Sequence, residues 1–201
     1  SRYGNAVYKV TVLGQSAHSA NSPDTGRNAI VLMSRIISNL TEANTPSAII
    51  TPGIISGGTS VNTVPERAEV DFDIRALSED DFKDIDKRFT EIVHRYSSGG
   101  YRVEVSCESK NPPFKKSDTS LELFKQLNRS ASTAGSSFNL NTEALRGGSD
   151  ANIISACGVP TLDGLGPYGE GAHTHEEFVF IPSIQEKVMS VSLFLANHLK
   201  L

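Results

Sequence analysis

A glycine-rich stretch near the C-terminus, residues 164–179, has the composition of a loop that could present a reactive side chain. Its sequence is GLGPYGEGAHTHEEFV, with His173 after four glycines and Glu177 four residues later. Glycines let a backbone approach a ligand closely, and a loop histidine can bind a metal ion or carry a proton. The alternative is a solvated loop with an incidental histidine, and this stretch alone does not decide between them.

A second candidate is Arg75, at the end of a segment in which apolar and charged residues alternate from 68 to 76. This alternation predicts a strand with Arg75 on its polar face. A guanidinium there can hold a carboxylate through two parallel hydrogen bonds. The alternative is a surface ion pair with Glu69 or Asp73 on the same face.

A third candidate is the run Arg146, Gly147 and Gly148, which precedes a short helix predicted from Asp150 to Ala156. Backbone N–H groups at a helix start can hold a carboxylate. Simple capping of that helix by Ser149 or Asp150 would explain the same residues.

The elements that position these residues follow from periodicity. Across the first hundred residues the order is β-α-β-β-α-β, with Ser78 as the N-cap of the second helix and Gly99 and Gly100 after it. The predicted strands are 7–13, 47–55, 68–76 and 101–107, and the first helix is 28–40. This order is typical of a ferredoxin-like domain, whose open edge often pairs with a second copy.

A polar stretch with two prolines, residues 110–117, marks a domain boundary, so we predict domains at 6–110 and 111–201. The second domain alternates helix and strand, which favours an α/β fold with a mostly parallel sheet. Its predicted helices are 120–131, 150–156 and 182–201, and its predicted strands are 139–145 and 161–165. So few strands indicate an incomplete domain.

Composition excludes several classes of function. The chain has 201 residues and a net charge of −4, with its Lys and Arg scattered, so nucleic acid is not an expected partner. No apolar run approaches the roughly 18 residues that cross a bilayer. Cys107 and Cys157 form no metal motif and favour a cytoplasmic setting. The G-x-S-x-G motif of serine hydrolases is absent from the sequence.

Four segments taken together resemble the dinuclear zinc aminoacylase and carboxypeptidase family. That family includes glutamate-releasing carboxypeptidases, acetylornithine deacetylase and succinyl-diaminopimelate desuccinylase. The four segments, in chain order, are 14–30, 57–75, 146–153 and 164–179. The resemblance implies that 6–110 is the family's lid, or dimerisation domain, through which a homodimer forms. It also implies that 111–201 is the C-terminal portion of a catalytic domain.

The resemblance also implies roles for individual residues. His173 matches the family's last zinc ligand, and Glu177 matches the acidic residue that could orient it. His18 matches a lid histidine that reaches into the neighbouring subunit's site and stabilises the oxyanion. Asn62 and Arg75 have the spacing of the family's lid Asn and Arg, and they would anchor a substrate carboxylate. Asn62 could instead donate its amide to the oxyanion. The run at 146–148 would contribute to the same carboxylate site.

The expected reaction is hydrolysis of an amide or peptide bond in an N-acyl amino acid or short peptide, assisted by two zinc ions. The family's His-x-Asp ligand pair and adjacent Glu pair do not occur in these residues, so we expect a fragment that is inactive alone. Gln15 stands where a basic residue is common, and the acyl group cannot be predicted. The alternative function is a non-catalytic homodimerising ferredoxin-like module.

Overall fold

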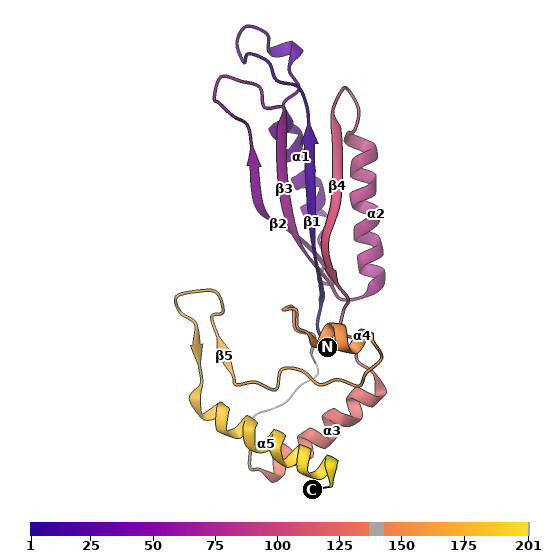
Figure 1. Cartoon of the computed structure of the whole chain (residues 1–201), viewed down its shortest axis with the longest axis vertical. Helices are drawn as coiled ribbons and strands as arrows, with labels where there is room; N and C mark the ends of the chain where they lie inside the picture. The colour runs from indigo at the N-terminus through magenta and orange to yellow at the C-terminus, as the bar shows by residue number, and fades with distance from the viewer. Residues whose placement is uncertain (137–142, 201) are drawn as a thin grey trace. The chain divides into compact units, whose positions relative to one another are not determined.

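The computed structural model describes residues 1–136 and 143–200, which divide into two units (Figure 1). The sheet unit comprises residues 2–113 and 145–148, and the helical unit comprises residues 1, 114–144 and 149–201. The predicted boundary between residues 110 and 111 falls at the end of the last strand of the sheet. The short segment 145–148, distant in sequence, belongs to the sheet unit.

The sheet unit has the β-α-β-β-α-β order that the sequence predicts. Its elements are β1 (Gly4–Leu13), α1 (Ala29–Glu42), β2 (Ala48–Gly57), β3 (Arg67–Ala76), α2 (Glu79–Tyr96) and β4 (Arg102–Asn111). A short 3-10 helix, η1 (Pro23–Thr25), lies in the loop between β1 and α1. The strands lie in the order β2-β3-β1-β4 and every neighbouring pair is antiparallel. This is the ferredoxin-like topology, and the predicted fold class is confirmed.

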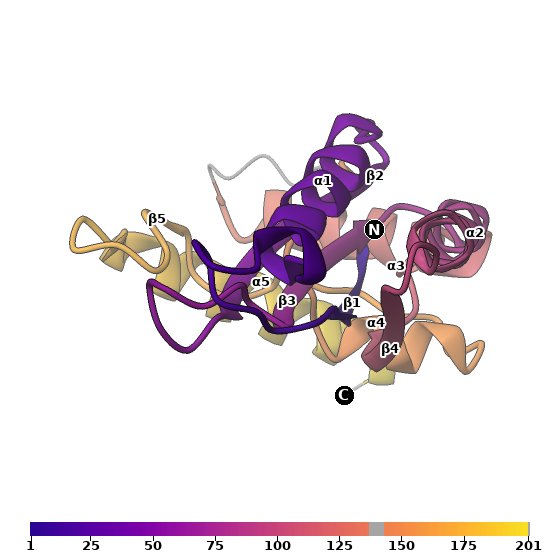
Figure 2. The same cartoon turned by 90° about the horizontal axis from the view of Figure 1, so that it is seen from above.

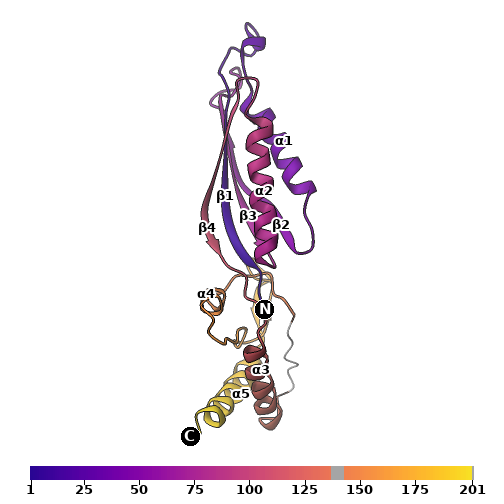
Figure 3. The same cartoon turned by 90° about the vertical axis from the view of Figure 1, so that its right-hand side faces the viewer.

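Both helices cover one face of this sheet, as Figures 2 and 3 show. Each begins at a side-chain cap, because Asn28 and Ser78 accept hydrogen bonds from the N–H groups of Val31 and Asp81. Their apolar stripes meet the apolar positions of the strands in one core. The largest core side chains that are fully buried include Met33, Ile36, Leu40, Phe72, Ile74, Phe82, Ile85 and Phe89.

The opposite face of the sheet is polar, because alternate strand residues point away from the helices. Asp71, Asp73 and Arg75 are half-buried there, between the buried residues of β3. An ion pair joins Lys9 of β1 to Asp71 across the strands, at 3.6 Å. The strict alternation predicted for 68–76 is therefore confirmed, and it leaves Arg75 on the open face.

The helical unit contains α3 (Asp118–Thr133), α4 (Ala151–Ala156), β5 (Gly169–Glu170), β6 (Phe178–Val179) and α5 (Ile181–Leu199). Helices α3 and α5 pack together, with Leu127 and Phe194 buried. Their side chains Gln126 and His198 lie within hydrogen-bonding distance, at 3.1 Å. Strands β5 and β6 form an antiparallel hairpin whose second strand leads directly into α5.

Two predicted strands of the second domain need separate accounts. Most of the strand at 139–145 lies outside the described residues, although Leu145 forms an isolated parallel bridge with Arg2. The prediction of a strand at 161–165 is wrong, because Gly164 adopts a left-handed backbone with φ 72°, which interrupts an extended run. The described residues of this unit accordingly contain no parallel sheet, and no described helix is long and apolar enough to span a membrane.

Candidate active-site residues

Two loops of the sheet unit extend beyond one end of the sheet in Figure 1, and His18 and Asn62 lie together in them. The loop after β1 carries His18, and the loop between β2 and β3 carries Asn62. His18 forms an isolated antiparallel bridge with Thr63, and the N–H of Ser19 donates to the carbonyl of Asn62 at 3.0 Å. The backbone thus holds the two side chains at a common tip.

Both tip residues present hydrogen-bond donors to solvent. The Nδ1 atom of His18 accepts from the backbone N–H groups of Ala20 and Asn21, at 3.2 Å each. A ring nitrogen that accepts carries no proton, so the neutral imidazole carries its proton on Nε2. The Oδ1 atom of Asn62 accepts from Ser60 at 2.9 Å, which leaves its amide nitrogen as the donor it can offer a ligand. Donors of this kind can stabilise developing negative charge.

Arg75 lies at the other end of the same sheet. In the pairing of β1 with β3, Arg75 is opposite Asn5, whereas Arg67 is opposite Leu13, next to the tip. The eight steps along the strand from Arg67 to Arg75 span about 27 Å at the usual rise of a strand. One chain therefore cannot bring Asn62 and Arg75 to the same carboxylate, and their expected joint role requires a correction.

The guanidinium of Arg75 is held by its neighbour on the strand. Its Nε and Nη2 atoms donate to the two carboxylate oxygens of Asp73, at 2.8 and 3.0 Å. This is the ion pair that the sequence offered as the alternative for Arg75. The third nitrogen, Nη1, donates to the carbonyl of Arg146 at 3.4 Å. That long hydrogen bond leaves Nη1 available to a stronger acceptor.

The run 146–148 lies against this end of the sheet. The carbonyl of Gly147 accepts from Arg2 Nη1 at 3.0 Å, and the carbonyl of Leu145 accepts from the N–H of Tyr3 at 2.9 Å. Capping is also present, because the Oγ atom of Ser149 accepts from the N–H of Ala151 at the start of α4. The structure thus brings Arg146, Gly147 and Gly148 to Arg75, as part of one unit.

His173 lies in the helical unit, in the loop that joins β5 to β6. Its backbone has φ 67°, a left-handed conformation that is uncommon for residues other than glycine. Thr174 anchors the loop, because its N–H and hydroxyl donate to the carbonyl of Gly171, at 3.0 and 2.7 Å. His173 is exposed, and so is Glu177, whose N–H donates to the carbonyl of Thr174 at 3.3 Å. Among the described residues no hydrogen bond joins the His173 and Glu177 side chains.

Comparison with known proteins identifies the chain's family. Residues 1–100 match the profile of the peptidase dimerisation domain. The chain belongs to the peptidase family that carries this domain. The match covers the first five elements of the sheet unit, βαββα, and ends before β4; it includes the tip and Arg75.

Relatives of this peptidase family member extend over nearly the whole chain. The chain is 28% identical to the uncharacterised protein YqjE of Bacillus subtilis, over 95% of this chain and 50% of that protein. It is 24% identical to carboxypeptidase G2 of a Pseudomonas species, over 92% of this chain and 45% of the relative. A Staphylococcus aureus tripeptidase structure superposes with a TM-score of 0.79 at 26% identity, covering 96% of this chain and 51% of that one. The chain thus spans about half the length of these relatives.

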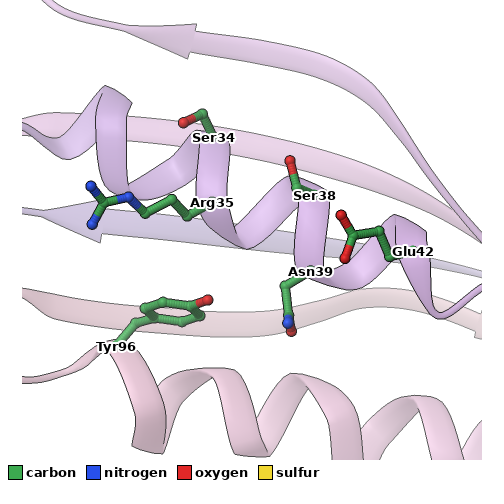
Figure 4. Close-up of a pocket in the computed structure, with 6 residues that line it drawn as sticks. All are labelled: Ser34, Arg35, Ser38, Asn39, Glu42 and Tyr96. Atoms are coloured by element: carbon green, nitrogen blue, oxygen red, sulfur yellow. The ribbon is translucent and has the colours of Figure 1, made fainter.

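The peptidase dimerisation domain also carries a groove on its helical face, shown in Figure 4. It has a volume of about 290 Å³ and lies between α1 and α2, on the face of the sheet opposite Arg75. Its lining is mostly polar: Ser34, Arg35, Ser38, Asn39, Glu42 and Tyr96. A second cavity, of about 350 Å³, lies at the tip and includes Thr63, the bridge partner of His18. Of these two hollows, the one at the tip lies closer to the candidate residues.

The sequence did not single out two neighbours of Arg75. Asp73 appeared only as an ion-pair alternative, although strand alternation already placed it beside Arg75 on one face. Asn5 was missed because it lies seventy positions away, and only the β1–β3 register brings it opposite Arg75. No local pattern could have shown that pairing, since a shift of one residue would move Asn5 to the other face.

Proposed function

We propose that this chain forms part of a zinc-dependent amidohydrolase. The substrate would be an N-acyl amino acid or a short peptide with a free carboxylate, cleaved at its amide or peptide bond. A carboxypeptidase and a tripeptidase resemble the chain over 92% and 96% of its length, which supports this class of reaction. Exposed donors at His18 and Asn62 and a guanidinium at Arg75 are the groups that such a substrate needs.

His173 would contribute one zinc ligand. Its exposed imidazole suits that role, and the described residues contain no group of three His, Cys, Asp or Glu that could hold a metal ion. The remaining ligands would therefore come from outside the described residues. When bound, zinc polarises the scissile carbonyl and activates water. Glu177 lies in the same loop and would help to orient His173.

A neighbouring apolar surface is consistent with this arrangement. In the helical unit, α5 and the residues before it expose large apolar side chains, including Phe178, Ile181 and Val188, at 52%, 72% and 60%. Exposed apolar patches of this kind usually mark a surface that another part of a protein covers. We propose that the rest of a catalytic domain packs there.

The observation that carries the proposed active site, with its residues shared between two subunits, is the separation of the two ends of the sheet. His18 and Asn62 lie at the tip, next to the Arg67 end of β3, and Arg75 lies about 27 Å from Arg67 along that strand. A substrate that is anchored by Arg75 of one subunit would meet His18 and Asn62 of a second subunit. In that arrangement Nε2–H of His18 donates to the oxyanion, while Arg75 holds the carboxylate.

The edge at which the second copy pairs would be β2. Its outer side has no partner strand in the described chain, and Ile54 and Ile55 are 68% and 62% exposed. Residues 48–57 contain no charged side chain, whereas the other edge strand, β4, contains Arg102, Glu104, Glu108 and Lys110. Charges protect a sheet edge from pairing, so the uncharged edge is the one suited to a homodimer.

The test is a subunit-mixing experiment with the zinc-supplemented whole protein. His18→Ala and Arg75→Ala variants are each expected to lose most activity. When they are unfolded together and refolded as mixed dimers, half of the dimers are mixed and each carries one intact site. Activity should then recover to about a quarter of the wild-type value. If recovery stays at the level of the separate variants, His18 and Arg75 do not act across a dimer.

The second candidate function is a non-catalytic homodimerising module. The uncharged β2 edge favours it as well, because pairing there needs no chemistry. Zinc content separates the two functions. The enzyme requires bound zinc that is lost in His173→Ala, whereas the module would dimerise with no zinc bound and show no hydrolysis of any N-acyl amino acid.

A further inference from the structure

The end of the sheet that carries Arg75 contains a second polar side chain placed to meet the same ligand. Asn5 is directly opposite Arg75 in the β1–β3 pairing, and both residues are half-buried on the open face. Side chains of directly opposed residues in antiparallel strands lie about 5 Å apart at Cβ. A methyl group at Gly148 would lie 2.7 Å from Asn5 Oδ1 and 3.9 Å from Arg75 Nη1. These three residues therefore lie close together at this end of the sheet.

We propose that Asn5 determines specificity at the carboxylate site and that Asp73 positions Arg75 within it. The inference rests on the proposed function, since it assigns further residues to the same site. It also replaces Asn62, which lies at the far tip, with a residue that adjoins Arg75 in the same chain.

Asp73 sets the direction of the guanidinium. Two hydrogen bonds to its carboxylate occupy Nε and one N–H of Nη2, which fixes both the rotamer and the plane of Arg75. Nη1 then points to the 146–148 segment, where its acceptor is a carbonyl at 3.4 Å. A substrate carboxylate is a stronger acceptor than a carbonyl and would displace that bond.

Asn5 supplies the second donor. Its Oδ1 atom accepts from Asn111 Nδ2 at 3.4 Å and lies against Gly148, so the group that it can offer a ligand is its amide nitrogen. Arg75 Nη1 and Asn5 Nδ2 would each donate to one oxygen of a single carboxylate. A carboxamide places an NH₂ group against one of these donors, and the site would reject it.

Charge makes Asn5 the sensitive position. Asp73 already pairs with Arg75, so part of the guanidinium's positive charge is compensated before the substrate binds. An aspartate in place of Asn5 keeps the shape of the side chain but adds a negative charge beside the incoming carboxylate. Like charges so close to each other oppose binding strongly.

The experiment uses the zinc-loaded whole protein and two substrates, an N-acyl amino acid and its C-terminal carboxamide. For Asn5→Asp we expect kcat/KM for the carboxylate to fall at least about tenfold, mainly through KM, while the carboxamide changes little. Asn5→Ala should give a smaller loss on the carboxylate alone. Asp73→Asn should raise KM for the carboxylate with kcat preserved. Asn39→Asp, the same chemical change on α1, is the matched control and should alter neither substrate.

Equal losses on both substrates in Asn5→Asp and Asn5→Ala would overturn the inference, because they indicate a structural role. Circular dichroism and thermal unfolding of each variant identify such a role directly. A wild-type protein that cleaves neither substrate would overturn the proposed function instead. The inference is then decided by calorimetric binding of the N-acyl amino acid. Wild type must bind it more tightly than Asn5→Asp, and equal or absent binding refutes the role of Asn5.

Discussion

His173 combines a proposed metal ligand with an unfavourable backbone, so its substitutions should affect stability and zinc binding in different ways. At φ 67° its Cβ approaches its own carbonyl, which costs a residue other than glycine about 1 kcal/mol. His173→Ala removes the imidazole and keeps the Cβ, and therefore keeps the strain. His173→Gly removes both. The free energy of opening the loop should thus be about 1 kcal/mol higher in the Gly variant than in the Ala variant, although both lose the zinc ligand.

Amide hydrogen exchange is the appropriate assay, because the loop is exposed and can open without global unfolding. The reporter is the N–H of Thr174, which donates to Gly171 across the turn at 3.0 Å. A difference of about 1 kcal/mol corresponds to roughly fivefold slower exchange in the Gly variant than in the Ala variant. Zinc content of the whole protein should fall equally in both.

Two results would refute this reasoning. Equal exchange of Thr174 in the Gly and Ala variants would show that the backbone at 173 is not strained. Unchanged zinc content in both would remove His173 from the metal site. Thr174→Gly is the control for added glycine flexibility, since Thr174 does not have a positive φ. We expect that variant to speed exchange at the turn, because it also loses the hydroxyl bond to Gly171.

Two further predictions concern the sheet unit. Ile54→Lys places a charge on the open β2 edge and should convert the dimer into a monomer with little change in thermal stability. Glu104→Lys on β4 should leave the dimer intact. Sedimentation velocity measures the oligomeric state of both variants. Burial and the hydrogen bond to Asp86 raise the pKa of Tyr8, so the stabilisation from this group is complete below about pH 10 and is lost as pH rises further. The free energy of unfolding of wild type, measured with urea, should therefore fall steeply above pH 10, and Tyr8→Phe should reduce that slope. An identical slope in both proteins would exclude Tyr8 as its source.

The sequence predicted the sheet unit well because its signals are local. Alternation along 68–76 and the capping serine at 78 each depend on a few neighbouring residues, and the structure confirms them. The short strand predicted at 161–165 is contradicted, because the sequence of this segment does not reveal that Gly164 adopts a left-handed backbone. Short runs of this kind depend on a partner strand, and the described residues provide none there.

The candidate site was harder to predict, since its geometry depends on register and not on spacing. Asn62 and Arg75 have the spacing of the family's lid Asn and Arg, and that resemblance implied a shared ligand. The intervening residues include most of β3, and an extended strand carries its ends as far apart as possible. Conversely, Asn5 and Arg75 are far apart in sequence and become neighbours only through antiparallel pairing.

The same geometry connects the edge of the sheet to its chemistry. If the substrate must meet Arg75 of one subunit and His18 of another, every active site contains the dimer contact as one of its structural elements. Ile54 lies on neither half of the site, yet Ile54→Lys should abolish hydrolysis together with dimerisation. Adding more of the Ile54→Lys chain, which carries intact His18, cannot restore hydrolysis while the β2 edge stays charged. Activity that survives in a monomeric Ile54→Lys protein would mean that the tip and Arg75 are not joined through this edge, and that one chain completes the site by itself.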